Sequence, residues 1–138
     1  MTDEQIAELA DNLDCGFRCF VHKETKTIVT TSDFENDLYS DADLWAEVNE
    51  KIEHNFDSYV EIEKMDSNES FRLMQNFIES IQDNQLRDKL DQALNKRKPF
   101  RNFKFEIDNS GSYRQKWFDF KKQQLIEWVK GQLTASDL

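Results

Sequence analysis

Glycine, proline and histidine are scarce in this sequence. Its 138 residues include three glycines, one proline and two histidines. Gly16, Gly111 and Gly131 stand far apart, and none belongs to a glycine-rich motif that could cradle a phosphate. This scarcity excludes a glycine-rich nucleotide-binding loop.

Long apolar runs are also missing. No run approaches the roughly 20 apolar residues that a membrane-spanning helix needs. The acidic, polar first residues predict neither a secretory signal nor an Arg-rich transit peptide, so we expect a soluble cytoplasmic protein with no membrane partner. The length and the aromatic content of 12% predict a single folded domain over residues 1–138, with a frayed end at residues 134–138.

The few metal-ligating residues form one suggestive pattern. Cys15, Cys19 and His22 give C-x3-C-x2-H, and His54 would be the fourth ligand of a zinc site. On a strand, residues four apart lie roughly 13 Å apart, whereas zinc-bound sulfurs lie about 2.3 Å from one ion. A disulfide also needs Cα atoms within about 7 Å. Both objections weaken if Cys15 lies in a turn. We interpret the cysteines as two buried or half-buried free thiols in a reducing compartment, and the histidines as surface or structural residues, with no metal and no cofactor.

The first half of the chain predicts a small antiparallel sheet with helices beside it. Residues 2–12 read as a helix with a capping box formed by Thr2 and Gln5. Residues 16–21 and 27–31 are rich in β-branched and aromatic residues and predict a hairpin. Residues 58–64 alternate and predict a third strand, which would pair with the hairpin.

Between the hairpin and the third strand we expect a polar loop and one more helix. The loop covers residues 32–40, and Ser40 is the candidate N-cap of the helix. The apolar face of this helix comprises Leu44, Trp45, Val48 and Ile52.

The second half keeps helical spacing almost throughout. A first helix, with Ser67 as candidate N-cap, has a face formed by Phe71, Met74, Ile78 and Ile81, widened by Phe77. A second helix, capped by Asp83, has Leu86, Leu90, Ala93 and Leu94 on one face. Their short connection predicts a helical hairpin.

Two further helices are expected after the hairpin. Pro99 can occupy the first turn of a helix in which Phe100, Phe103 and Ile107 share a face. Phe103, Phe105 and Ile107 also alternate as in a strand, but only the helix explains Phe100. The last helix covers about residues 112–133, and its broad face comprises Tyr113, Trp117, Phe120, Leu125, Trp128 and Leu133. The predicted fold is α+β: the hairpin and two C-terminal helices form a helical body, packed with an antiparallel sheet of about three strands.

The motifs of the second half resemble a small bacterial family of uncharacterised proteins, family 0158 of the UPF class. The shared features are a Met-x-x-Phe-Ile segment, a Leu-x-x-x-Leu-x-x-Ala-Leu helix, a basic-Pro-Phe-Arg-x-Phe-Lys segment and a Trp-x-x-Phe helix. The resemblance covers about residues 59–133. The matching positions are Met74, Phe77, Ile78, Leu86, Leu90, Ala93, Leu94, Pro99, Phe100, Arg101, Phe103, Lys104, Trp117 and Phe120. The resemblance supports the expected fold, and it implies no catalytic or binding activity.

Charge is distributed unevenly along the chain. Residues 1–70 contain 19 acidic and 5 basic side chains, and residues 71–138 contain 9 acidic and 13 basic ones. Such asymmetry suggests an interaction surface. The candidate binding surface, which we call the basic patch, comprises Lys96, Arg97, Lys98, Arg101 and Lys104. Basic side chains beside Phe100 and Phe103 could bind single-stranded nucleic acid, but they also suit a solvated surface above a core stripe.

Two carboxylates offer a catalytic alternative. Glu61 and Glu63 would lie on one face of the third strand, about 6.6 Å apart by strand rise, a spacing that a glycosidase could use. They lie opposite Val60 and Ile62 and therefore face solvent, where a carboxylate is a poor general acid.

Three functions follow, in decreasing order of support. The first is a non-enzymatic interaction or regulatory protein that binds a cytoplasmic protein through an acidic or aromatic surface. The second is a nucleic-acid-associated module that uses the basic patch. The third is a hydrolase that uses Glu61 and Glu63. We favour the absence of enzymatic activity and name no catalytic residue.

Overall fold

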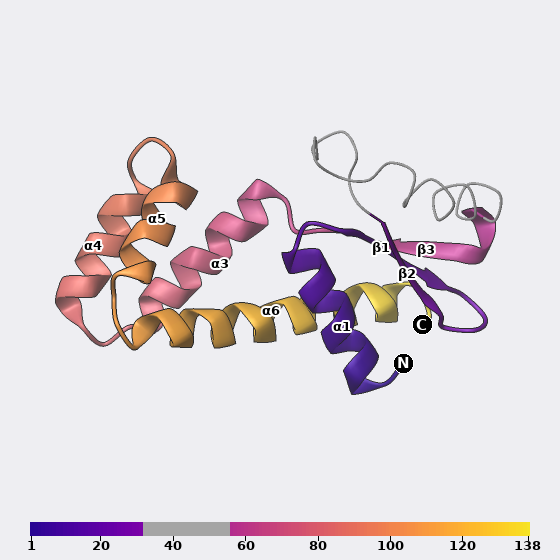
Figure 1. Cartoon of the computed structure of the whole chain (residues 1–138). Helices are drawn as coiled ribbons and strands as arrows, with labels where there is room; N and C mark the ends of the chain where they lie inside the picture. The colour runs from indigo at the N-terminus through magenta and orange to yellow at the C-terminus, as the bar shows by residue number, and fades with distance from the viewer. Residues whose placement is uncertain (32–55) are drawn as a thin grey trace. The chain divides into compact units, whose positions relative to one another are not determined.

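The computed structural model describes residues 1–31 and 56–138, and its fold is α+β as predicted. These residues form two compact units (Figure 1). The sheet unit comprises Met1–Lys64 and Leu125–Leu138, and the helical unit comprises Met65–Gln124. A single domain over residues 1–138 therefore stays a prediction. The expected loop at 32–40, the helix with Ser40 as N-cap, and His54 lie outside the described residues.

The sheet unit begins with helix α1, Asp3–Asp14. The predicted capping box is confirmed, since the Thr2 hydroxyl accepts from the Gln5 backbone N–H and the Gln5 side chain accepts from the Thr2 backbone N–H. The helix buries one apolar stripe. Its C-cap is Cys15, and the following residue, Gly16, adopts φ +89°. That positive φ suits glycine, which has no Cβ to clash. The buried stripe is Ile6, Leu9, Ala10 and Leu13.

The sheet has three antiparallel strands in the order β2-β1-β3. Strand β1 is Arg18–His22, β2 is Ile28–Thr31, and β3 is Tyr59–Ile62, preceded by a 3₁₀ turn at Phe56–Ser58. Both β2 and β3 pair with β1, so the predicted hairpin and its pairing with the third strand are confirmed.

Helix α6, Tyr113–Ala135, ends in the sheet unit. Leu125, Val129 and Leu133 are buried there. Asp137 has φ +58°, the Leu138 N–H donates to the Leu133 carbonyl, and the Asp137 N–H donates to the Thr134 carbonyl. This is a Schellman motif. Helix α6 thus continues to Ala135 and ends in a capping motif, and the fraying of residues 134–138 stays a prediction.

The helical unit contains α3 (Ser67–Ser80), α4 (Asn84–Leu94), α5 (Pro99–Asp108) and the first part of α6. Asp83 caps α4 as predicted, accepting from the Gln85 and Leu86 backbone N–H groups. The predicted cap of α3 was wrong by one residue. The N-cap is Asp66, whose carboxylate accepts from the Glu69 N–H, and Ser67 is the first residue of the helix. A carboxylate also interacts favourably with the helix dipole at this end.

One hydrophobic cluster forms the core of the helical unit. Phe77 and Trp117 pack with ring centroids 5.2 Å apart, and Phe103 meets Trp117 edge-on at 4.9 Å. Leu73, absent from the predicted face of α3, is buried, whereas Phe71 and Met74 are only partly buried. The buried residues of the cluster are Leu73, Phe77, Ile78, Ile81, Leu86, Leu90, Leu94, Phe103, Ile107 and Trp117.

The segment from Phe100 to Ile107 is helical as favoured, but the reason given for that choice was wrong. Phe100 was assigned to the core and is 37% exposed, whereas Phe103 and Ile107 are 1% exposed. Phe103 and Ile107, four residues apart, define the inward direction of α5. Phe100 lies at the margin of their stripe, in the first helical turn.

Within residues 1–31 and 56–138, none of the helices combines the length and the apolarity needed to cross a membrane.

Candidate functional site

The basic patch lies on α5 and on the short turn that connects α4 to α5. The two helices lie side by side (Figure 1), and side-chain hydrogen bonds hold the turn between them. The Asn102 side-chain amide donates to the Arg97 carbonyl at 2.8 Å and to the Ala93 carbonyl at 3.5 Å. Lys98 is the N-cap of α5 in the left-handed region, with φ 57°, and provides no side-chain cap. These contacts fix the backbone that carries the patch, while leaving its side chains directed to solvent.

All five residues of the basic patch are exposed. Among the residues that the structure describes, none of the five forms an ion pair, whereas Arg18, Arg72, Arg114 and Lys130 each pair with a carboxylate. A cluster of unpaired cations is unexpected in a protein of net charge −10, because acidic side chains are abundant. The patch therefore keeps its positive charge available to an anionic partner.

Two exposed phenylalanines accompany these cations. Phe105 is 65% exposed and Phe100 is 37% exposed, and neither contacts another ring or a cation within the described part of the chain. Phe118 on α6 is 40% exposed, but the Arg114 guanidinium lies 4.7 Å from its ring centroid. The exposure of Phe105 was not predicted. Phe105 would share a face with Phe103 and Ile107 only in a strand, and the predicted helix assigned no environment to it.

A small hollow of about 140 Å³ lies between α4 and α5. The α4 side supplies Lys89, Gln92, Ala93 and Lys96, and the α5 side supplies Asn102, Phe105 and Glu106. Lys96, a member of the basic patch, and the exposed residue Phe105 thus line the same concave surface. The volume is below the roughly 300–1,000 Å³ of typical small-molecule sites.

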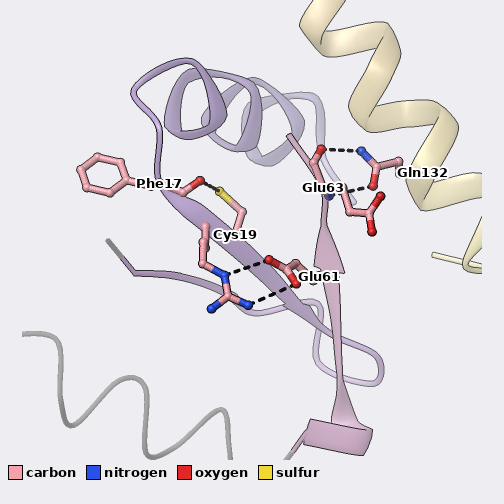
Figure 2. A network of polar contacts seen from close by, with 6 residues as sticks. Phe17, Cys19, Glu61, Glu63 and Gln132 are labelled. Carbon is pink, nitrogen blue, oxygen red and sulfur yellow. Dashed lines mark hydrogen bonds and ion pairs between the residues drawn. The ribbon is translucent and has the colours of Figure 1, made fainter. Parts of the chain in front are cut away.

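The proposed catalytic carboxylates are not arranged as expected. Glu61 forms a two-point ion pair with Arg18, with nitrogen–oxygen distances of 3.0 and 3.3 Å. Strand β3 ends at Ile62, so Glu63 does not continue the face of Glu61. In Figure 2 the two carboxylates point to opposite sides of the strand. The predicted exposure of both side chains, on either side of the buried Ile62, is confirmed, whereas the prediction that they share one face was wrong.

The backbone of Glu63 is instead held by α6. The Glu63 N–H donates to Gln132 Oε1 at 2.8 Å, and Gln132 Nε2 donates to the Glu63 carbonyl at 2.9 Å (Figure 2). Trp128 Nε1 donates to the same carbonyl at 2.8 Å. The Gln132 amide thus replaces the hydrogen bonds that a neighbouring strand would make. The backbone of Glu63 therefore has a structural role at the end of β3.

The cysteines and His22 also have local surroundings of their own. Cys15 is the C-cap of α1 and is exposed, so the prediction that it is buried or half-buried was wrong, because it lies in the turn after the helix. This is the turn that weakens the geometric objection to a metal site or a disulfide. Cys19 lies in β1 and is completely buried, and burial raises the pKa of its thiol to about 11. His22 Nδ1 accepts from the Glu24 and Thr25 backbone N–H groups, which fixes the hairpin turn. His22 is therefore a structural residue of the turn.

Comparisons with known proteins identify relatives but no activity. A family model described as "Uncharacterised protein family (UPF0158)" matches residues 4–138. The chain is similar to "UPF0158 protein PA5073" of Pseudomonas aeruginosa, with 29% identity over 77 residues. That match covers 56% of this chain and 50% of the relative, so it spans about half of the relative's length. No solved structure matches the chain significantly.

Proposed function

The chain belongs to the uncharacterised protein family UPF0158, and we propose that it is a cytoplasmic, non-enzymatic interaction protein. In this proposal it binds another protein through the basic patch and the neighbouring phenylalanines of the helical unit.

One observation carries this proposal: within residues 1–31 and 56–138 the five exposed cations of the basic patch form no ion pair, and two exposed phenylalanines beside them contact no other ring or cation. Exposed aromatic side chains within a charged rim are typical of the centres of protein interfaces. The cations would steer an acidic partner and fix its orientation, while Phe100 and Phe105 would supply apolar contact.

The division of charge between the units supports the same surface. The helical unit contains 12 basic and 9 acidic residues, whereas the described residues of the sheet unit include 5 basic and 11 acidic ones. A positively charged unit attached to a strongly negative one would distinguish anionic partners by their length. It attracts a short acidic segment at close range, while the whole molecule repels long polyanions.

A nucleic-acid-associated role is the second candidate, and the exposure of Phe100 and Phe105 favours it. Bases stack on exposed aromatic rings, and cations track the phosphates. The strongly acidic sheet unit opposes this role at low salt, where its repulsion reaches furthest.

Affinity capture separates the two roles. The tagged full-length chain is incubated with lysate, with and without nuclease, beside an Arg101→Glu/Lys104→Glu variant and an Arg72→Glu control on α3. We expect a protein retained by wild type and by the control, lost from the double variant, and unaffected by nuclease. Capture that nuclease abolishes would instead support the nucleic-acid role, and equal capture by the double variant would contradict both.

A further inference from the structure

We propose that the hollow between α4 and α5 is the docking site for an acidic segment of the partner protein, with one apolar side chain seated against Phe105. This inference rests on the proposed function and specifies its site and its ligand. The segment's carboxylates would meet Lys89 and Lys96, and its apolar side chain would cover Phe105 and Ala93.

The surroundings of Phe105 suggest an anchor position. Phe105 is the most exposed large hydrophobic residue of the described chain, at 65%, yet it lines a hollow whose other members include the buried Ala93. An aromatic ring beside a concave surface offers an incoming apolar side chain contact on more than one side. A volume of about 140 Å³ suits one side chain and is too small for a typical cofactor site.

Charge complementarity defines the rest of the occupant. Lys89 and Lys96 line the hollow, and neither has an ion-pair partner within residues 1–31 and 56–138. Across residues 84–108, seven side chains are basic and four are acidic. An apolar contact with two lysines on its α4 side complements an acidic segment that carries one apolar side chain.

The same hollow disfavours nucleic acid. The acidic residue Glu106 is one of its lining residues, and Phe105 is the single aromatic residue among them. Surfaces for single-stranded nucleic acid stack successive bases on several rings and follow the backbone with cations. A peptide can direct its carboxylates away from Glu106, whereas regularly spaced phosphates cannot all avoid it.

The test uses the full chain and three labelled probes in fluorescence anisotropy. The first is a short peptide that repeats Glu-Glu-Leu, the second is a peptide of equal length that repeats Glu-Glu-Ser, and the third is oligo(dT). We expect the leucine peptide to bind about tenfold more tightly than the serine peptide, the gain from burying an apolar side chain. Phe105→Ala should remove that gain, and Lys89→Glu/Lys96→Glu should weaken binding of both peptides.

Phe118→Ala is the matched control, because Phe118 is an exposed phenylalanine outside the hollow. It should bind both peptides as wild type does. Equal affinity for the two peptides, an unchanged gain in Phe105→Ala, or tighter binding of oligo(dT) would overturn the inference. If those results came with protein capture that still depended on Arg101 and Lys104, the proposed function would stand and only this site would fail.

Discussion

At the scale of single residues, the helical unit offers two phenylalanines in opposite environments. Phe77 is 3% exposed and contacts Trp117 and Phe120, whereas Phe105 is 65% exposed. We expect Phe77→Ala to lower the free energy of unfolding by about 3–5 kcal/mol, since it removes buried surface and leaves a cavity. Phe105→Ala should change it by less than about 0.5 kcal/mol. Denaturant titration of both variants checks this, and similar losses would contradict the burial of Phe77.

Cys19 gives a pH-dependent prediction. Burial raises the pKa of its thiol to about 11 from an ordinary value of 9.0. Because the folded pKa is above the unfolded one, the thiol's contribution is complete below pH 9 and is lost as the pH rises toward 11. We expect stability to fall by up to about 1.4 kcal/mol per pH unit within this window.

The control for that prediction is Cys19→Ala, which should lose this component of the pH dependence. Thiol labelling of the native protein near pH 8 should modify Cys15 and spare Cys19 until the chain unfolds. Rapid labelling of Cys19 in the native protein would contradict its burial, and an unchanged pH dependence in Cys19→Ala would assign the effect to other groups.

Helix caps were predictable from the sequence where a local pattern of residues determines the hydrogen bond. Thr2 with Gln5, and Asp83 before its helix, act through hydrogen bonds within three residues, so their spacing alone predicts the caps. Asp66 competes with Ser67 as cap of α3, and the sequence does not distinguish two adjacent cap-forming residues. The exposure of Phe100 depends on which direction of α5 meets the core, which is a tertiary property.

At the scale of elements, helix α6 holds the end of strand β3 through Gln132. Its side-chain amide satisfies both the N–H and the carbonyl of Glu63. Gln132→Ala should therefore destabilise the sheet unit by about 1 kcal/mol, since the Glu63 N–H loses its partner while the Glu63 carbonyl keeps the hydrogen bond from Trp128 Nε1. Hydrogen exchange at the Glu63 amide should accelerate specifically.

Thr134→Ala is the matched change on the same helix, because Thr134 is exposed. It should leave the exchange of the Glu63 amide as in wild type. Equal acceleration in both variants would indicate general loosening of α6 and would contradict a specific role for Gln132.

The elements of the fold were largely predictable, and the candidate site only in part. Hydrophobic period identifies α3 and α4 because each has one buried face. Strand β1 buries the consecutive residues Cys19, Phe20 and Val21 and therefore both of its faces, so its β-branched and aromatic residues identify it instead. The end of β3 after Ile62 was not predictable, because it depends on Gln132, which is 69 residues away from Glu63 in the sequence. The basic patch follows from composition, but the hollow at Phe105 requires the packing of α4 against α5.

At the scale of the whole molecule, the cations of the basic patch offset part of a large negative charge. Arg101 and Lys104 are exposed and make no ion pair in the described part of the chain. Arg101→Glu/Lys104→Glu shifts the net charge from −10 to −14 without breaking such a contact. The remaining effect on stability is repulsion between like charges, which salt screens.

We therefore expect that double variant to lose no more than about 1 kcal/mol of stability at 0.15 M salt, where the Debye length is about 8 Å. The loss should grow at about 0.01 M salt, where that length is about 30 Å. Arg101→Gln/Lys104→Gln changes the charge by half as much and should lose about half as much. Denaturant titrations at the two salt concentrations measure both losses. A large loss that did not depend on salt would mean that these side chains make specific contacts within the chain, and the basic patch would then be part of the fold and no longer available to a partner.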